Sequence, residues 1–282
     1  MNSAMSKRID SHHHLWAIND TDYVWMTDDH AVIRRDFLGA EMKSAFAEGS
    51  IAGSVAVQAR QIIEETEFLL NLSEQNPEIR GVVGWVPLRE NAGEPHLERF
   101  AGYQKLKGVR HVVHDEPDDD FILSDAFNEG IARLKQHDLL YDILIFYKHL
   151  PQTIEFVDRH PGQPFVVDHI AKPRIAKGAF DQEWADNMRE LAKREHVSCK
   201  VSGVLTEVRD ETWDLELLQP YFDTVFEAFG PKRVMFGSDW PVLLLRDSYG
   251  VWSKTAQQLS ASLSEDEKAA FWGGNAARIY RL

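Results

Sequence analysis

Imidazole and carboxylate side chains gather at three places in this sequence, each beside a short apolar run that is typical of a buried strand. His12 and His14 stand at the first place, His169 at the second and Asp239 at the third. Imidazoles bind divalent metals or donate hydrogen bonds to a carbonyl oxygen, and a carboxylate at a strand end can act as a general base. A lone buried histidine is usually a core residue, and a lone strand-end aspartate is usually a helix cap. The four together are harder to attribute to chance, so they are the predicted catalytic residues.

The spacing of three consecutive histidines predicts which of them act together. In an extended strand, alternate side chains share a face. We therefore expect His12 and His14 to point together into the interior and His13 to point away. Two convergent imidazoles can bind a metal or contact the carbonyl group of a substrate.

Cationic, aromatic and polar side chains near the same strand ends are candidates for binding a substrate. Arg110 carries a planar fork of donors that suits hydroxyl or carboxyl oxygens, although a salt bridge to an acidic residue is an equal alternative. Asp142 lies inside an apolar strand and needs a partner, which could be structural. The predicted substrate-binding residues are Arg110, Lys172, Tyr23, Trp25, Asp142, His114, Tyr147 and Trp240.

The elements that position these residues alternate between short β-rich runs and longer helical patterns. Strands are expected at Arg8–Asp10, Ile51–Gln58, Gly81–Val86, Leu106–His111, Leu140–Phe146, Phe165–Asp168, Val197–Val201 and Val234–Phe236. Helices are expected at Asp36–Glu48, Glu64–Gln75, Asp125–His137, Leu150–Arg159, Gln182–Arg194, Leu215–Phe229 and Ser248–Leu259, with a weaker one near Ala92–Gly102. Repeated strand–helix units favour a parallel sheet closed into an α/β fold, the (β/α)8 TIM barrel, whose reactive groups lie at the carboxyl ends of the strands.

The length of 282 residues suits one such barrel, and no Pro/Gly/Ser-rich linker divides the chain, so residues 1–282 are expected to form a single domain. A loop without periodicity is expected at 15–35, directly after the first strand. It contains the large side chains Trp16, Tyr23, Trp25 and Met26. An aromatic loop at this end of a barrel is interpreted as a lid over the substrate, with a hydrophobic plug of the barrel mouth as the alternative.

The composition narrows the class of protein and its partners. The formal net charge is −14, which argues against nucleic acid or an anionic membrane as a partner, because both would be repelled. The single cysteine, Cys199, cannot form an internal disulfide, and no apolar run is long enough to span a bilayer. We expect a cytoplasmic protein that acts on a small molecule. The oligomeric state is not predicted.

Several motifs together resemble the amidohydrolase superfamily, and within it the branch of lactonases that do not depend on a metal. The matching segments are Asp10–Trp16, Gly108–Arg110, Asp168–Pro173, Lys200–Gly203, Phe236–Pro241 and Gly274–Tyr280. They extend over essentially the whole chain, and their combination is specific although His-x-His alone is weak. The resemblance is strongest to L-fuconolactonases and L-rhamnonolactonases. It implies an amidohydrolase-type barrel that hydrolyses a sugar aldonolactone, such as L-fuconolactone, in carbohydrate catabolism.

The chain departs from the binuclear members of this superfamily in an informative way. Those members carry a metal-bridging lysine on the fourth strand and a histidine at the end of the fifth. This sequence has Arg110 and Asp142 in those strands, so a two-metal site is not expected. A single divalent metal, zinc, bound by His12, His14 and Asp239 is geometrically possible. The resemblance implies that such a metal is not required.

The same residues leave other functions open. Metal-dependent decarboxylases and aromatic-acid hydrolases on this barrel also use His-x-His and a last-strand aspartate, and the fold alone does not separate them from lactonases. They are expected to need a tightly held metal and a more basic pocket. A non-catalytic sugar-acid-binding protein is the third alternative. It would keep binding its ligand when Asp239 is replaced.

Overall fold

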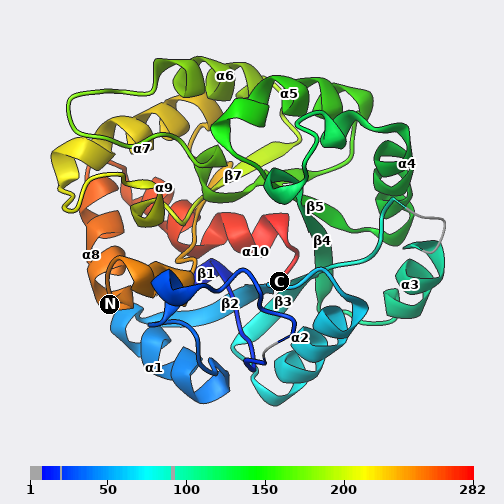
Figure 1. The fold of residues 1–282 in the computed structure, drawn as a ribbon. Helices are drawn as coiled ribbons and strands as arrows, with labels where there is room; N and C mark the ends of the chain where they lie inside the picture. The colour runs from blue at the N-terminus through cyan, green and yellow to red at the C-terminus, as the bar shows by residue number, and fades with distance from the viewer. Residues whose placement is uncertain (1–7, 20, 90–92) are drawn as a thin grey trace.

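The computed structural model describes residues 8–19, 21–89 and 93–282. Within these residues, eight parallel strands follow one another in chain order around one sheet. Their bounds are β1 (Arg8–His13), β2 (Ile51–Val57), β3 (Ile79–Gly84), β4 (Leu106–Val112), β5 (Leu140–Leu144), β6 (Phe165–Val167), β7 (Val197–Val201) and β8 (Val234–Phe236). A ring of helices surrounds the strands (Figure 1). The predicted (β/α)8 barrel is confirmed.

The helices of the outer ring agree with the predicted ones to within a few residues at each end. They are α1 (Gly39–Gly49), α2 (Ile63–Gln75), α3 (Gly93–Phe100), α4 (Asp125–Leu134), α5 (Leu150–Arg159), α6 (Gln182–Ala192), α7 (Leu215–Phe229) and α8 (Tyr249–Leu259), followed by α9 (Glu265–Ala269) and α10 (Asn275–Ile279). Ala92, where the weak third helix was expected to begin, lies outside the described residues. Across the described part of the chain, no helix is both long and apolar enough to cross a membrane.

The first strand is longer than predicted because both of its neighbours hold it. It extends to His13 instead of ending at Asp10, and His13 pairs with Ala56 of β2 on one side and Trp240 on the other. The backbone N–H groups of Ser238 and Asp239 both donate to the carbonyl oxygen of His12, at 3.2 and 2.8 Å. These bonds close the barrel between β8 and β1 at the carboxyl ends of the strands.

The buried Asp10 carboxylate strengthens the same seam. It accepts hydrogen bonds from the backbone N–H and the hydroxyl of Ser238 and from the hydroxyl of Tyr249. Because Ser238 precedes Asp239, this network fixes the loop that carries the predicted general base.

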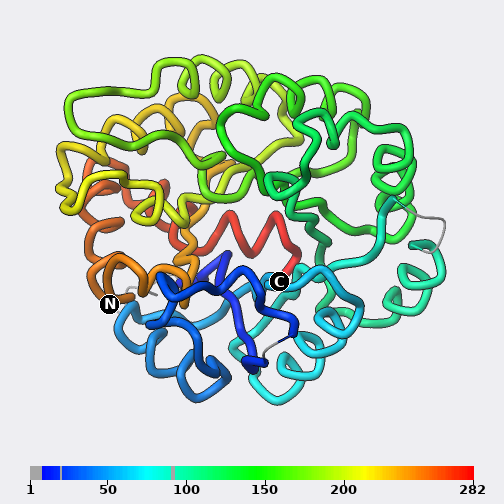
Figure 2. The backbone as a smooth tube through the Cα atoms, viewed as in Figure 1, coloured from blue at the N-terminus to red at the C-terminus, as the bar shows by residue number. Residues whose placement is uncertain are grey.

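Helix α10 lies at the opposite, amino-terminal end of the barrel. The chain path in Figure 2 runs once around the ring before its red C-terminal segment crosses the centre. Ala276 and Tyr280 pack there in one apolar cluster with Ile9, Val55 and other strand residues. With this end filled, the carboxyl ends of the strands are left to form a site.

The loop at 15–35 is anchored to the barrel at both ends. The backbones of Trp16 and Phe37 bond to each other in both directions, and the Trp16 indole N–H donates to the carbonyl oxygen of Arg35 at 2.8 Å. In the middle, the carboxylate of Asp22 pairs with the guanidinium of Arg60 at 2.6 Å. The loop is therefore held against the strand ends by contacts along its length.

Candidate active site

A cavity of about 330 Å³ opens at the carboxyl ends of the strands, within the size range of small-molecule sites. It is lined by His14, Trp16, Trp25, His30, Ala59, Arg110, Val112, His114, Asp115, Leu144, His169, Lys172, Asp239 and Val242. Two further cavities have no histidine in their lining. One, of about 370 Å³, is lined by residues 176–180 and by residues between 214 and 221. The other, of about 680 Å³, is lined by residues 213–216 and by residues between 251 and 258. The cavity at the strand ends is therefore the candidate active site.

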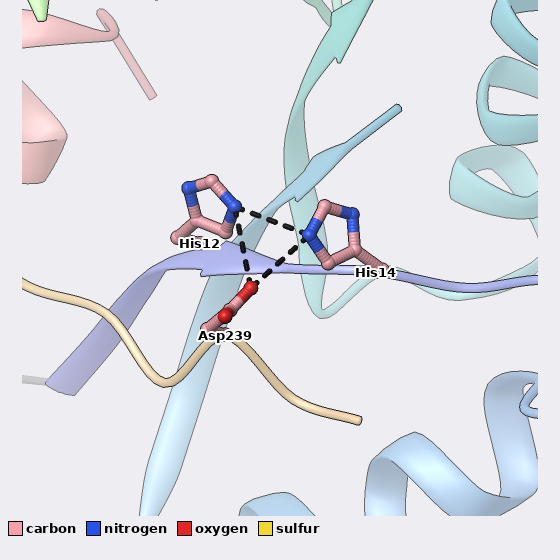
Figure 3. A group of neighbouring side chains, drawn as sticks. All are labelled: His12, His14 and Asp239. Carbon is pink, nitrogen blue, oxygen red and sulfur yellow. Dashed lines mark hydrogen bonds and ion pairs between the residues drawn. The ribbon is translucent and has the colours of Figure 1, made fainter. Parts of the chain in front are cut away.

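Three of the four predicted catalytic residues meet closely beside this cavity. The Nε2 atoms of His12 and His14 lie 3.2 Å apart, and Oδ1 of Asp239 lies 3.2 Å from Nε2 of His14 and 3.8 Å from Nε2 of His12 (Figure 3). All three residues are buried. His13 points to the other face, where its ring bonds to the hydroxyl of Ser54 and packs on Phe46. The alternation expected along this strand is confirmed.

The fourth, His169, reaches the group from an unusual backbone turn after β6. His169, Ile170, Ala171 and Lys172 all have left-handed φ values, between 49° and 59°. Each such residue costs roughly 1–2 kcal/mol, so the turn persists only because its surroundings fix it. The indole N–H of Trp184 donates to the carbonyl oxygen of Ile170 at 2.6 Å. The backbone N–H of Lys172 donates to the carbonyl oxygen of His169. The turn brings both His169 and Lys172 to the cavity.

The His169 ring is held between the seventh and eighth strand ends. Its Nδ1 bonds to the hydroxyl of Ser202 at 2.9 Å, and its Nε2 lies 3.8 Å from Oδ1 of Asp239. Its ring centroid lies 4.4 Å from that of His12. The three imidazoles and the carboxylate therefore form one cluster, as the sequence predicted.

The electrostatics of the cluster favour neutral imidazoles at His12 and His169 beside an ionised carboxylate at Asp239. Burial lowers the pKa of both His12 and His169 well below the usual histidine value. Burial by itself raises the pKa of Asp239, but the imidazoles of His169 and His14 beside it outweigh that effect and hold its pKa below the usual range. A carboxylate that stays ionised at neutral pH is available as a base or as a metal ligand.

The donor set fits a divalent metal ion. Nδ1 of His14 lies 2.8 Å from the carbonyl oxygen of Val57, which can only accept, so a neutral His14 carries its proton on Nδ1 and presents a bare Nε2. That lone pair faces Nε2 of His12 and Oδ1 of Asp239. Three converging acceptors repel one another unless a proton or a cation lies among them. All three ligand atoms lie within 4.8 Å of one another, and imidazole with carboxylate is a common set for zinc.

Four of the predicted substrate-binding residues line the cavity: Arg110, Lys172, Trp25 and His114. Both cations already have carboxylate partners. Arg110 lies 3.0 Å from Asp168, and Lys172 lies 2.8 Å from Glu207.

The other four predicted substrate-binding residues lie outside the lining of this cavity. Asp142 is fully buried inside the barrel against Lys200, the structural alternative considered for it. Tyr147 packs under the guanidinium of Arg174. Tyr23 is buried against Trp16, and Trp240 is buried against Phe37. Tyr23, Asp142 and Trp240 are buried in the protein, and Tyr147 is half-buried.

Two buried residues at the centre of the site, Asp168 and Lys200, are not among the site residues predicted from the sequence. Asp168 bonds to Nδ1 of His12 at 3.2 Å, and Lys200 lies 3.0 Å from Asp168 and 3.2 Å from the same nitrogen. The signal was present, because both residues belong to motifs that follow or lie within apolar strands. His30 and Asp115 also line the cavity without having been predicted as site residues, and Trp16, expected only as part of the lid, lines it as well.

Comparison with known proteins gives relatives that match this chain over nearly their full length. The amidohydrolase family profile matches residues 9–282. An L-fucono-1,5-lactonase of Burkholderia multivorans is 40% identical over 293 residues, covering 98% of this chain and 96% of that protein. A second L-fucono-1,5-lactonase, of Burkholderia ambifaria, is 34% identical over 282 residues, covering 99% and 97%.

Solved structures agree in fold over the whole length. An amidohydrolase from Burkholderia multivorans with bound HEPES superimposes with a TM-score of 0.93 at 38% identity, covering 98% of this chain and 99% of that one. A crystal form with bound zinc gives 0.92 with the same identity and coverage. 5-Carboxyvanillate decarboxylase from Sphingomonas paucimobilis, at 15% identity and a TM-score of 0.67, shares the fold alone. This chain therefore belongs to the amidohydrolase family, a family of enzymes built on the (β/α)8 barrel.

Proposed function

We propose that this protein hydrolyses a sugar aldonolactone, L-fucono-1,5-lactone or a closely related L-sugar lactone, to the sugar acid. The observation that carries the proposal is the carboxylate of Asp239, held with three imidazoles beside a cavity of about 330 Å³. The substrate class comes from the two L-fuconolactonases that match the chain over nearly its full length.

In the proposed reaction, Asp239 takes a proton from water while the water oxygen attacks the lactone carbonyl carbon. The carbonyl oxygen gains the negative charge as the carbon becomes tetrahedral. The bond between that carbon and the ring oxygen then breaks, and Asp239 returns its proton to the leaving ring oxygen. Water and lactone give a hydroxy acid, which ionises in solution. An alkoxide leaves more readily than an amine anion, so ester opening makes a smaller demand on the site than amide hydrolysis.

The hydrogen-bond partners of the imidazoles indicate which of them can donate a hydrogen bond to the substrate carbonyl oxygen and which can bind a metal. A neutral His14 has its proton on Nδ1, so its Nε2 cannot donate to the carbonyl oxygen. The Nδ1 of His169 faces a hydroxyl, which can donate, so its Nε2 can carry the proton that stabilises the developing charge. Such a donor is worth roughly 3–4 kcal/mol in the transition state. His169 is therefore the proposed carbonyl donor, and His12 and His14 are proposed to bind a metal when one is present.

A zinc ion bound by His12, His14 and Asp239 would act as a Lewis acid toward the lactone carbonyl. We propose that it is not required. Prolonged chelation, followed by metal analysis and assay, should leave activity in the metal-free protein. Loss of activity that zinc restores would make the metal essential.

The charges around the cavity favour an uncharged substrate. Arg110 is paired with Asp168 and Lys172 with Glu207, so neither cation is free to neutralise a substrate carboxylate. Asp115 and Asp239 add negative charge to the lining. A neutral lactone suits this field better than the carboxylated substrates of decarboxylases. The indoles of Trp16 and Trp25, both in the 15–35 loop, are proposed to cover the apolar face of the sugar ring as a lid.

The proposal places the protein in sugar catabolism, in the cytoplasm, with L-fucose degradation as the favoured context. Its partner is the small-molecule lactone itself. We propose no association with nucleic acid or with membranes, because the net charge of −14 opposes both.

The experiment that tests the function is a pH-indicator screen of an aldonolactone panel, since ring opening releases a proton. L-Fuconolactone, L-rhamnonolactone and galactonolactone should be compared in the 1,5 and 1,4 ring forms, with Asp239→Asn protein as the control for spontaneous hydrolysis. Enzyme-dependent opening of an L-sugar lactone is expected. A panel without turnover, together with carbon dioxide release from an aromatic acid, would replace the lactonase with a decarboxylase.

A further inference from the structure

The centre of the barrel contains an ionic layer where apolar side chains usually fill such barrels. Lys200 on β7 is fully buried, with its ammonium 2.5 Å from Asp142 on β5 and 3.0 Å from Asp168 at the end of β6. Arg110 on β4 pairs with Asp168 at 3.0 Å. From the amino-terminal end, the hydroxyl of Tyr280 donates to Asp142. Two cations balance two carboxylates, so the layer is neutral as a whole.

His12 lies on top of this layer, and each of its ring nitrogens faces one donor and one acceptor. At Nδ1, the acceptor is Asp168 and the donor is Lys200, both at 3.2 Å. At Nε2, the acceptor is the bare Nε2 of His14 at 3.2 Å and the donor is Arg110 at 3.3 Å. A neutral imidazole donates from one nitrogen and accepts at the other. In either tautomer, therefore, the protonated ring nitrogen of His12 has an acceptor and the other ring nitrogen has a donor.

The two tautomers suit two different states of the site. With the proton on Nδ1, His12 donates to Asp168 and presents a lone pair at Nε2, as a metal ligand must. With the proton on Nε2, His12 donates to His14 and accepts from Lys200. This second tautomer places a proton among the three converging acceptors of His12, His14 and Asp239, and so removes their repulsion without a metal.

We propose that Lys200 and Asp168 are positioning residues that form a tautomer switch for His12. Lys200 supports the Nε2-protonated form, which stabilises the metal-free site, and Asp168 supports the Nδ1-protonated form, which binds zinc. The switch gives a physical reason why one chain can keep an intact site with or without the metal. It concerns the proposed active site, but its readouts need no lactone, so failure of the lactonase proposal would leave it open to test.

The test uses the full-length protein labelled with ¹⁵N-histidine, because ring nitrogen shifts report which nitrogen carries the proton. The His12 signals are assigned by their loss in His12→Gln. In the metal-free wild type, His12 is expected to be protonated on Nε2, and addition of Zn²⁺ is expected to move the proton to Nδ1. A proton on Nδ1 in the metal-free wild type overturns the proposal.

The variant that isolates Lys200 is the double substitution Lys200→Met with Asp142→Asn. Lys200→Met alone would leave two buried carboxylates with one cation, whereas the double variant keeps the net charge and the contact of Asp168 with His12. It should shift metal-free His12 to the Nδ1-protonated form. Zinc affinity, measured by competition with a chelator, should rise roughly 2- to 12-fold, the value of one hydrogen bond. Because the double variant removes one positive and one negative charge, net charge alone predicts no change in zinc affinity. An unchanged His12 tautomer in this variant would overturn the proposed switch.

Two single variants complete the comparison. Asp168→Asn replaces the charged acceptor of the metal-binding tautomer by a neutral amide oxygen, which accepts more weakly. Zinc affinity should fall roughly 10- to 100-fold, as for other groups that orient a metal-binding histidine. Tyr280→Phe removes a contact with Asp142 but touches neither Lys200's contact with His12 nor Asp168. It should lower stability while leaving the His12 tautomer and zinc affinity unchanged. A tautomer change in Tyr280→Phe as large as in the double variant would mean that general loosening of the layer, and not Lys200, controls His12.

Discussion

Asp239 has a backbone fixed in a left-handed conformation and a buried carboxylate that lies beside three imidazoles. Its φ of 61° is left-handed, and its N–H donates to the carbonyl oxygen of His12, so the side chain is aimed from a fixed position at the barrel seam. Its carboxylate is buried but lies beside three imidazoles, which compensate for the loss of water. A residue held in this way is suited to take a proton from water without reorganising.

Substitution of the base tests this role most directly. Asp239→Asn keeps the size and shape of the side chain but cannot accept a proton, so kcat for lactone opening should fall roughly 10²- to 10⁴-fold, the usual contribution of a general base. Circular dichroism and the thermal midpoint should stay close to those of the wild type. Near-normal turnover would exclude Asp239 as the base.

The pKa of Asp239 predicts the acid limb of the pH–rate profile. The base works only when it is ionised, and its pKa lies below the usual aspartate value of 3.8 because His169 and His14 overcome the effect of burial. His12 and His169, whose pKa values are lowered, stay neutral in the same range. We therefore expect kcat/KM to be nearly constant from pH 7 to pH 5. If kcat/KM instead falls between pH 5 and 7 while the protein stays folded, the ionisation of a group other than Asp239 controls activity at acid pH.

At the scale of elements, the loop after β7 lies in close contact with the side chains of His169 and Asp239. Gly203 has φ of 61°, and a β-carbon there would lie 2.6 Å from Nδ1 of His169 and 3.1 Å from Oδ2 of Asp239. The loop needs glycine both for its backbone conformation and for the close approach of these two residues.

A pair of glycine variants separates the two requirements. Gly203→Ala should lower kcat/KM at least about 100-fold, because small displacements of catalytic groups are costly. Gly178, with φ of 77° and open space around its β-position, is the matched control, since it carries the backbone penalty without the contact. Gly178→Ala should lose about 1 kcal/mol of stability and keep its activity. Equal activity losses in the two variants would show that backbone strain alone explains the effect. Urea unfolding and lactone assays measure both quantities.

At the scale of the whole molecule, burial of histidines links stability to pH. The pKa is lowered in seven of them, mainly by burial: His12, His13, His111, His114, His160, His169 and His196. The unfolded chain takes up protons on these rings below about pH 6.5, whereas the folded protein does not. Folding therefore becomes less favourable as the pH falls through that value. Asp10 and Asp142 act in the opposite direction, because burial raises the pKa of each to about 6 and the folded state gains their protons first.

The histidines outnumber these two carboxyls, so we expect the free energy of unfolding in urea to decrease between pH 8 and pH 5. His13 provides a specific check, because burial lowers its pKa to about 3. From pH 8 to pH 5 it should account for about 2 kcal/mol of the decrease. His13→Gln should show a decrease smaller by about that amount. Parallel pH dependences in the two proteins would contradict a neutral, buried His13.

Much of the architecture follows from local patterns in the chain. Apolar runs alternating with helical periodicity specify eight strand–helix units, and the ends of those units meet at one rim when the barrel closes. His12, His14, His169 and Asp239 each stand at such an end, so their meeting was predictable although more than two hundred positions separate the first from the last. The alternation of β1 also fixed which histidines face inward.

What the sequence could not determine is where side chains beyond the regular strand pattern point and which partners they find. Tyr147 and Trp240 stand near the right strand ends but pack against Arg174 and Phe37 outside the cavity lining. The left-handed turn at 169–172 likewise depends on a contact with a distant element, the hydrogen bond from Trp184 on α6 to Ile170. Lys200 and Asp168 are 32 positions apart, and only closure of the barrel brings both to one nitrogen of His12. Local sequence sets the period of the elements, whereas hydrogen bonding between distant parts of the chain decides the protonation and the partners of the groups that react.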